Sequence, residues 1–171
     1  DNLWFLGTND GIGSELFRLD GTGIEKMSST LGNSLGQYMS LNIIGGVVLF
    51  DAPRVGSPDI HLLAFDNSNQ TLFNINPALS SPGMSGGATI NNGKLFFDCD
   101  STLGTEMCIS DGTVSGTKVL ADVMTGVSDS DPRDIMVVAG EVVAVAKGWN
   151  GSANIGYALY SYSDSGATLL W

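Results

Sequence analysis

The residues best suited to contacting a ligand lie in segments rich in Gly, Ser and Asn, a composition typical of loops. Trp149, in the segment KGWNGS, is flanked by Gly and Asn, so we expect its indole to be exposed and to stack on a sugar ring or an apolar partner. The alternative is that Trp149 plugs the space beneath its own loop. Candidate ligand-binding residues in such segments are Trp149, Asn150, Asp10, Arg54, Asp59, Asp131 and Arg133, and Asp51 and Asp129 lie in the same segments.

Metal binding and catalysis find less support in the sequence. The segment SDSDPRD at 128–134 offers alternate carboxylates for Ca²⁺ but lacks the Gly and Glu of an EF-hand loop, which favours a solvated acidic loop. A single His61 and two cysteines argue against a zinc site, and no GxSxG elbow or phosphate-binding loop occurs. A glycoside hydrolase stays open as an alternative, because Asp residues are plentiful in the loops. We expect a protein without catalytic activity and without a required cofactor.

The two cysteines, Cys99 and Cys108, follow each other in the segments KLFFDCD and TEMCIS. If these segments are neighbouring antiparallel strands, the two sulfurs can face each other across the ladder and form a disulfide. A disulfide would indicate an oxidising compartment, and therefore a secreted or cell-surface protein. The alternative is a pair of small buried thiols.

Composition limits the classes of partner. The chain has 171 residues, of which 43% are hydrophobic, and a net charge of −11, so nucleic acid would be repelled by it. No run of apolar residues is long enough to cross a membrane, so we expect no membrane insertion.

Two patterns recur along the chain. Tight turns precede strongly apolar segments in IIGGVVLF, INNGKLFF and VAGEVVAV, and Val47, Lys94 and Glu141 follow one another at steps of 47 residues. Hairpin turns recur as LDGT, FDNS, SDGT and SDSG, with extra residues before the last of them, in KGWNGSANIGYALY. A period in the mid-forties with four short strands per unit is typical of a propeller blade. The sequence therefore predicts an all-β, four-bladed propeller-like domain over 1–171, with repeats at about 1–35, 36–82, 83–128 and 129–171.

The segments GSELFRLDGT and GTEMCISDGTVSGTKVLADV resemble the ELWxxDGT repeat, which occurs in large, mostly bacterial, exported or surface proteins. The resemblance is carried by residues 95–123 and 3–27, and Phe17, Leu63, Cys108 and Tyr160 stand at the position of the motif Trp. It implies a propeller-like repeat and an extracellular setting. From the residues themselves, we expect Glu15 and Glu106 to bond back to turn amides, so that the repeated hairpin is structural.

Function is expected where the units differ. Alternating strand direction puts the long segments on one edge of the array and the tight turns on the other, which favours a non-catalytic adhesion module that binds carbohydrate or protein through its long loops. The alternative is a purely structural segment of a larger propeller. The first unit has three strands where the others have four, so we also expect its open edge to accept a strand from a neighbouring segment or chain.

Overall fold

The computed structural model describes residues 2–7, 15–28, 40–53, 60–79, 84, 87–150 and 152–171. Within these ranges the regular elements are fifteen β-strands, and none is a helix. The first sheet contains β1 (Leu3–Gly7), β2 (Glu15–Asp20) and β3 (Gly23–Lys26). The second contains β4 (Leu41–Ile44), β5 (Val47–Pro53), β6 (Ile60–Asp66) and β7 (Thr71–Asn74). The third contains β8 (Ala88–Asn91), β9 (Lys94–Ser101), β10 (Gly104–Ser110) and β11 (Lys118–Ala121). The fourth contains β12 (Arg133–Val138), β13 (Glu141–Trp149), β14 (Asn154–Ser163) and β15 (Gly166–Leu169).

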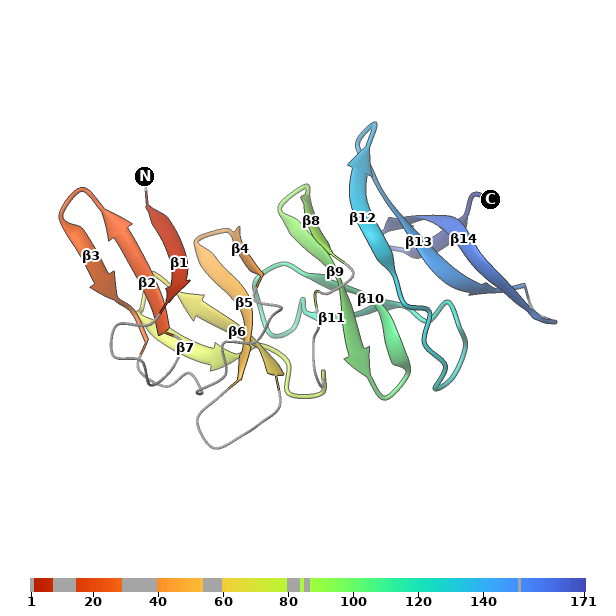
Figure 1. Cartoon of the computed structure of the whole chain (residues 1–171), viewed down its shortest axis with the longest axis horizontal. Helices are drawn as coiled ribbons and strands as arrows, with labels where there is room; N and C mark the ends of the chain where they lie inside the picture. The colour runs from red at the N-terminus through yellow and green to blue at the C-terminus, as the bar shows by residue number, and fades with distance from the viewer. Residues whose placement is uncertain are drawn as a thin grey trace.

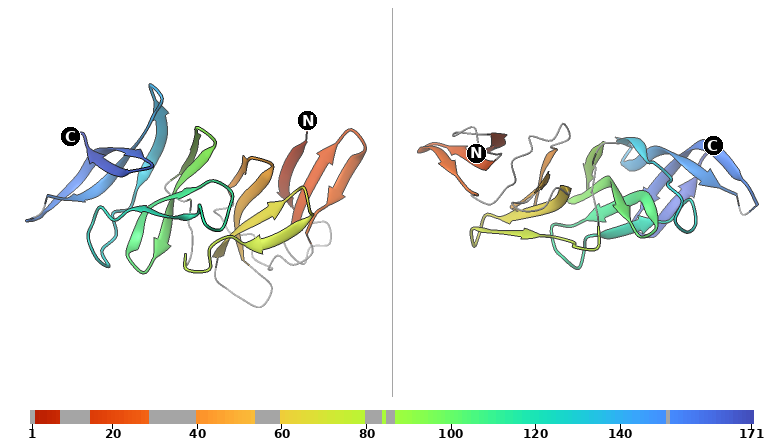
Figure 2. Two further views of the ribbon diagram at one scale, coloured as in Figure 1. Left: turned by 180° about the vertical axis from the view of Figure 1, so that it is seen from behind. Right: turned by 60° about the horizontal axis from the view of Figure 1, so that its bottom comes forward.

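Each sheet is a simple antiparallel meander whose strands pair in chain order. The sequence prediction of an all-β chain with repeated sheets, three strands in the first unit and four in the others, is confirmed for the described residues. The four sheets lie side by side in a row, with the first and the fourth at opposite ends (Figure 1). The two further views show the same succession from one end to the other (Figure 2).

Each inner sheet buries both of its faces. We call the face toward the preceding sheet the backward face and the face toward the following sheet the forward face. Alternating residues of a strand point to opposite faces, so Leu95 and Phe97 of β9 pack backward while Phe96 packs forward. Three apolar clusters result, one at each junction between neighbouring sheets. This alternation explains why the strong strands are apolar at nearly every position.

The clusters consist of residues from two neighbouring sheets each. Between the first and second sheets they are Trp4, Leu16, Val48, Phe50, Ala52, Leu63 and Phe65. Between the second and third they include Leu49, Leu62, Ala64, Leu95, Phe97, Cys99 and Cys108. Between the third and fourth they include Phe96, Met107, Ile109, Val142, Ala144, Ala146, Tyr160 and Tyr162. The forward face of one sheet thus meets the backward face of the next at all three junctions.

The four residues at the motif Trp position occupy the same place in their sheets. Phe17 pairs with Phe5, Leu63 with Phe50, Cys108 with Phe97 and Tyr160 with Ala144 in the strand registers. All four lie on the backward face of their sheet. The internal repeat is therefore one of register as well as of sequence.

The repeated hairpin turns are held by side chains that bond to their own backbone. Asp20 accepts hydrogen bonds from the Thr22 amide (2.8 Å) and hydroxyl (2.6 Å), and Asp111 accepts the same pair from Thr113 at 2.9 and 2.7 Å. These bonds favour the carboxylate, so hydrogen bonding by Thr22 and Thr113 lowers the pKa of Asp20 and Asp111. The prediction that the hairpin motif is structural agrees with these contacts.

The motif glutamates do not bond to the turns, contrary to our expectation. Glu106 is fully buried and accepts hydrogen bonds from the amides of Val123 (3.0 Å) and Met124 (3.5 Å) and from the Ser130 hydroxyl (2.6 Å). Glu15 accepts a bond from the Ser28 hydroxyl (2.9 Å) in the corresponding place. Glu106 and Glu15 therefore hold the residues that follow the second strand of each hairpin. These residues lie near the start of the first strand of the hairpin, at the end away from the turn.

Cys99 and Cys108 form the expected disulfide. They lie on adjacent strands, β9 and β10, as diagonal neighbours: Cys99 is opposite Glu106, and Cys108 is opposite Phe97. Their Cα atoms are 5.8 Å apart, within the range that a disulfide spans. Both side chains are fully buried against the second sheet.

Candidate functional site

Four of the residues predicted from the sequence come together at the loop end of the fourth sheet. Trp149 ends β13 and is 42% exposed, which excludes the alternative of a buried plug. A bulge between Gly148 and Trp149 shifts the register, so that Trp149 faces Asn154. The extra residues of the fourth unit therefore lengthen the β13–β14 hairpin, where the sequence suggested a loop, and Trp149 lies near the tip of this hairpin.

Asn150 builds the tip of the hairpin. Its Oδ1 accepts hydrogen bonds from the amides of Ser152 and Ala153, both at 3.0 Å, and its own amide donates to the Ala153 carbonyl at 3.2 Å. The side-chain oxygen is thus engaged in an Asx-type turn. Asn150 therefore stabilises the hairpin tip that follows Trp149. Its side-chain oxygen is already bonded to the backbone, which leaves fewer free groups for a ligand than the sequence suggested.

Arg133, Tyr157, Lys147 and Asp131 form a compact cluster beside this hairpin. The Arg133 guanidinium lies 3.8 Å from the centre of the Tyr157 ring, and the Lys147 ammonium lies 5.8 Å from it. Lys147 also bonds to Asp131, and this hydrogen bond raises the pKa of Lys147. Together with Trp149 these residues present aromatic rings and charges of both signs, and we call the five of them the loop-end surface.

The loop-end surface continues into an apolar sheet face. Tyr157 pairs with Lys147, and farther along the same face lie Val145 and Val143 of β13, with Leu159 of β14. This is the forward face of the fourth sheet. In the second and third sheets the same face packs against the following sheet.

The acidic segment at 128–134 bonds mainly to the protein itself. Asp129 Oδ1 accepts the Thr105 amide at 2.9 Å, and Asp131 is paired with Lys147. Among the described residues there is no group of three or more His, Cys, Asp or Glu side chains placed to hold a metal ion.

The remaining candidates have different outcomes. Asp10, Arg54 and Asp59 lie outside the described residues. The expectation that Asp51 lies on the loop edge is wrong, because it sits in β5 and is 1% exposed. One Asp51 oxygen accepts the Ser40 amide at 2.7 Å, and burial raises the pKa of Asp51 to about 7.

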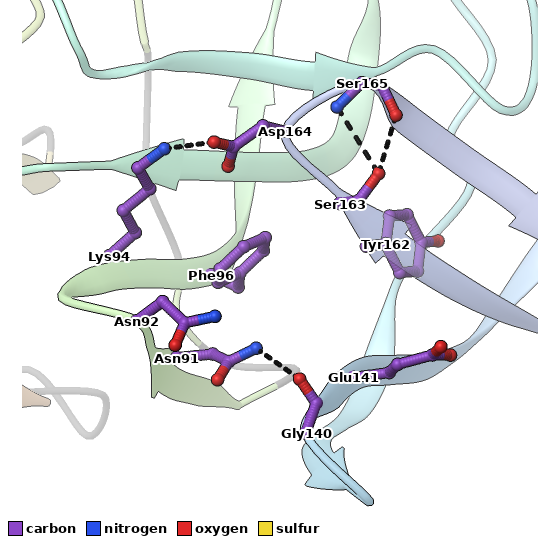
Figure 3. A pocket seen from close by; sticks show the side chains of 10 residues that line it. All are labelled: Asn91, Asn92, Lys94, Phe96, Gly140, Glu141, Tyr162, Ser163, Asp164 and Ser165. Carbon is purple, nitrogen blue, oxygen red and sulfur yellow. Dashed lines mark hydrogen bonds and ion pairs between the residues drawn. The ribbon is translucent and has the colours of Figure 1, made fainter.

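A pocket that the sequence did not indicate lies on the opposite edge of the array, between the third and fourth sheets. It has a volume of about 460 Å³ and is formed where the tight turns of both sheets approach each other (Figure 3). Its lining residues are Asn91, Asn92, Lys94, Phe96, Gly140, Glu141, Tyr162, Ser163, Asp164 and Ser165. The turns INNG, VAGE and SDSG could have drawn attention to it, but each is fully explained by the need for a turn.

Comparison of the chain with protein-family models finds no match, and the search of curated proteins finds no similar protein. In the described part of the chain no helix is long and apolar enough to span a membrane.

Proposed function

We propose that the chain is a non-catalytic binding module of an exported protein and that it recognises a protein partner through the loop-end surface. The observation that carries the proposal is the 42% exposure of Trp149 at the end of β13, two residues beyond Lys147, in the sheet that also carries the Arg133–Tyr157 stack. Trp, Tyr and Arg are the residue types that contribute most to protein–protein binding. The disulfide supports an extracellular setting, since such bonds persist in oxidising compartments.

A protein partner suits this surface better than a glycan. Arg133 covers one face of the Tyr157 ring, and a sugar therefore cannot stack on that face. Exposed apolar surface continues along the same sheet face at Met136, which is 48% exposed and pairs with Val143. A mixed surface of aromatic, apolar and charged groups matches the core and rim of a protein interface.

Removing the indole tests this proposal. A displayed library of random twelve-residue peptides is panned against the wild-type chain, and the affinity of the enriched peptides is then measured for Trp149→Ala. We expect binding to weaken at least tenfold while the circular dichroism spectrum and Tm stay nearly unchanged, because an exposed side chain contributes little to folding.

Val114→Ala is the matched control, because Val114 is 57% exposed in the hairpin turn of the third sheet, on the turn edge and away from the loop-end surface. It should leave peptide affinity unchanged. If no enriched peptide distinguishes Trp149→Ala from the wild type, the loop-end surface is not the recognition site. If Trp149→Ala unfolds the chain, Trp149 belongs to the core.

The same proposal includes a finer architecture, in which the four sheets are consecutive blades of a propeller-like array. Forward-to-backward packing at three successive junctions supports it, as does the common register of the motif positions. The backward face of the first sheet carries Phe5 and Phe17, stacked at 5.3 Å, with Leu19 and Ile24 exposed beside them. Such a face is suited to packing against another unit of the same kind.

Strand β1 should also accept a further strand. Its only strand partner among the described residues is β2, so one edge of β1 offers unpaired backbone groups. We expect small-angle scattering and mass measurement of the isolated chain to show an elongated particle that self-associates as concentration rises. A compact monomer at all concentrations, with the dimensions of a closed ring, would contradict both the open edge and the open faces.

A further inference from the structure

A groove runs along the turn edge of the molecule between the third and fourth sheets. The pocket of about 460 Å³ forms one part of it, and a second hollow of about 200 Å³ forms the other. Lys94 and Asp164 line both hollows, and their ion pair lies between them. The second hollow continues over Lys118 and Leu120 of β11.

The first hollow has a polar rim, and Phe96 and Tyr162, each 4% exposed, contribute a small apolar part of its lining. The rings of Phe96 and Tyr162 stand on opposite sides of it, and the side-chain amide of Asn92 points into the space (Figure 3). Ser163 and Ser165 close the upper side, and their hydroxyls lie 2.7 Å apart. On the lower side Asn91 donates to the Gly140 carbonyl at 2.9 Å, which ties the turn of the third sheet to that of the fourth.

The chemistry of this lining selects among ligand classes. Amide, hydroxyl and carboxylate groups form directional hydrogen bonds with hydroxyl groups, and the small exposed parts of the two rings add apolar contact with a sugar. An anionic ligand is disfavoured by Glu141 and Asp164 and by the net charge of −11. A purely apolar ligand would take the polar rim out of water without offering it hydrogen bonds.

We propose that this groove binds a neutral oligosaccharide, with one or two sugar rings in the first hollow and the chain continuing past the Lys94–Asp164 pair into the second. The volume of the first hollow lies within the range of small-molecule sites. The two sheets are joined across the groove by Asn91–Gly140 and by Lys94–Asp164, so the walls are held at a fixed separation. This site lies on the edge opposite the loop-end surface and does not depend on the function proposed for that surface.

The test uses saturation-transfer NMR and isothermal titration calorimetry with neutral tetrasaccharides of glucose, xylose, mannose and N-acetylglucosamine. We expect at least one of them to bind with a dissociation constant below about 1 mM, a modest value for an open, polar groove. Ser163→Trp should weaken that binding at least tenfold, because Ser163 lines the rim of the first hollow, where an indole obstructs the bound sugar, while the exposed Ser163 contributes nothing to the core.

Ser152→Trp is the matched control, since it places the same bulk on an exposed serine of the β13–β14 hairpin. It should leave sugar affinity unchanged, as should Trp149→Ala. Lys94→Gln should weaken the tetrasaccharide more than the corresponding disaccharide, because the pair lies between the two hollows. Absence of binding by all four sugars at 5 mM, or binding that Ser163→Trp does not alter, would overturn the proposal.

Discussion

The chain should be more stable at pH 5 than at pH 8. Burial raises the pKa of Glu106 and of Asp51 to about 7, from ordinary values of 4.5 and 3.8. Between these values and pH 7 the folded state holds protons that the unfolded state has released, so the free energy of unfolding falls as pH rises through this window. Each of the two groups contributes about 1.4 kcal/mol for each of about 2 pH units, so we expect a loss of about 5 kcal/mol between pH 5 and pH 8, or about 10–20 °C in Tm.

The double variant Asp51→Asn, Glu106→Gln serves as the control for this prediction. It removes both buried carboxyl groups and keeps all the other carboxylates. Any pH dependence that comes from repulsion among those other carboxylates is therefore the same in the variant and the wild type. The carboxyls with a lowered pKa, such as Asp20 and Asp111, lose their contribution only below about pH 4, outside the window. Thermal unfolding followed by circular dichroism should show a steep pH dependence in the wild type and a nearly flat one in the variant. Equal slopes would show that neither buried carboxyl is responsible.

Glu106→Ala should be among the most destabilising single substitutions in the chain. The change leaves the amides of Val123 and Met124 without the acceptor they now share, and the Ser130 hydroxyl keeps only its bond to the Thr105 carbonyl at 3.2 Å. Unsatisfied buried donors cost about 1–3 kcal/mol each, so we expect a loss of about 3 kcal/mol in the free energy of unfolding. Urea titration of the variant measures it directly.

Two variants show whether this loss comes from the hydrogen bonds. Glu106→Gln keeps an acceptor oxygen and should lose less than half as much stability. Glu15→Ala removes the corresponding motif residue of the first unit, which is partly exposed, accepts one hydrogen bond from Ser28 and pairs with Lys26, and it should cost about 1 kcal/mol. Equal losses at Glu15 and Glu106 would contradict the role assigned to burial.

The strands and turns could be predicted from the sequence because their signals are local. Alternation of apolar and polar residues on both sides of Asp20 and Asp111 specifies a hairpin, and the hydrogen bonds of these residues to the following Thr confirm it. The disulfide was also within reach, since Cys99 and Cys108 flank one short turn. Trp149 was expected to be exposed because of its small polar neighbours, and it is.

The burial of Asp51, the position of Tyr157 and the groove between the third and fourth sheets depend on tertiary packing and strand register. Local sequence patterns do not specify either. Asp51 follows the apolar run VVLF and precedes Pro53, where a strand gives way to a loop, and its burial follows from the packing of the second sheet on its neighbours. Tyr157 was overlooked because its role depends on the register that brings it opposite Lys147 and beside Arg133. The groove between the third and fourth sheets forms where turns of two different sheets approach each other. Each of these turns is fully explained by its own hairpin, so none of them indicates a groove in the sequence.

The packing of forward faces on backward faces also governs how the molecule comes apart. A sheet in the middle of the row is held on two sides, and a sheet at either end on one, so the free energy needed to open a unit rises toward the centre. The third sheet is cross-linked by the disulfide and packed on both faces, so we expect it to be the last sheet to unfold. Such a linear design lets evolution lengthen or shorten the array by whole units, because each junction depends only on the two sheets that form it.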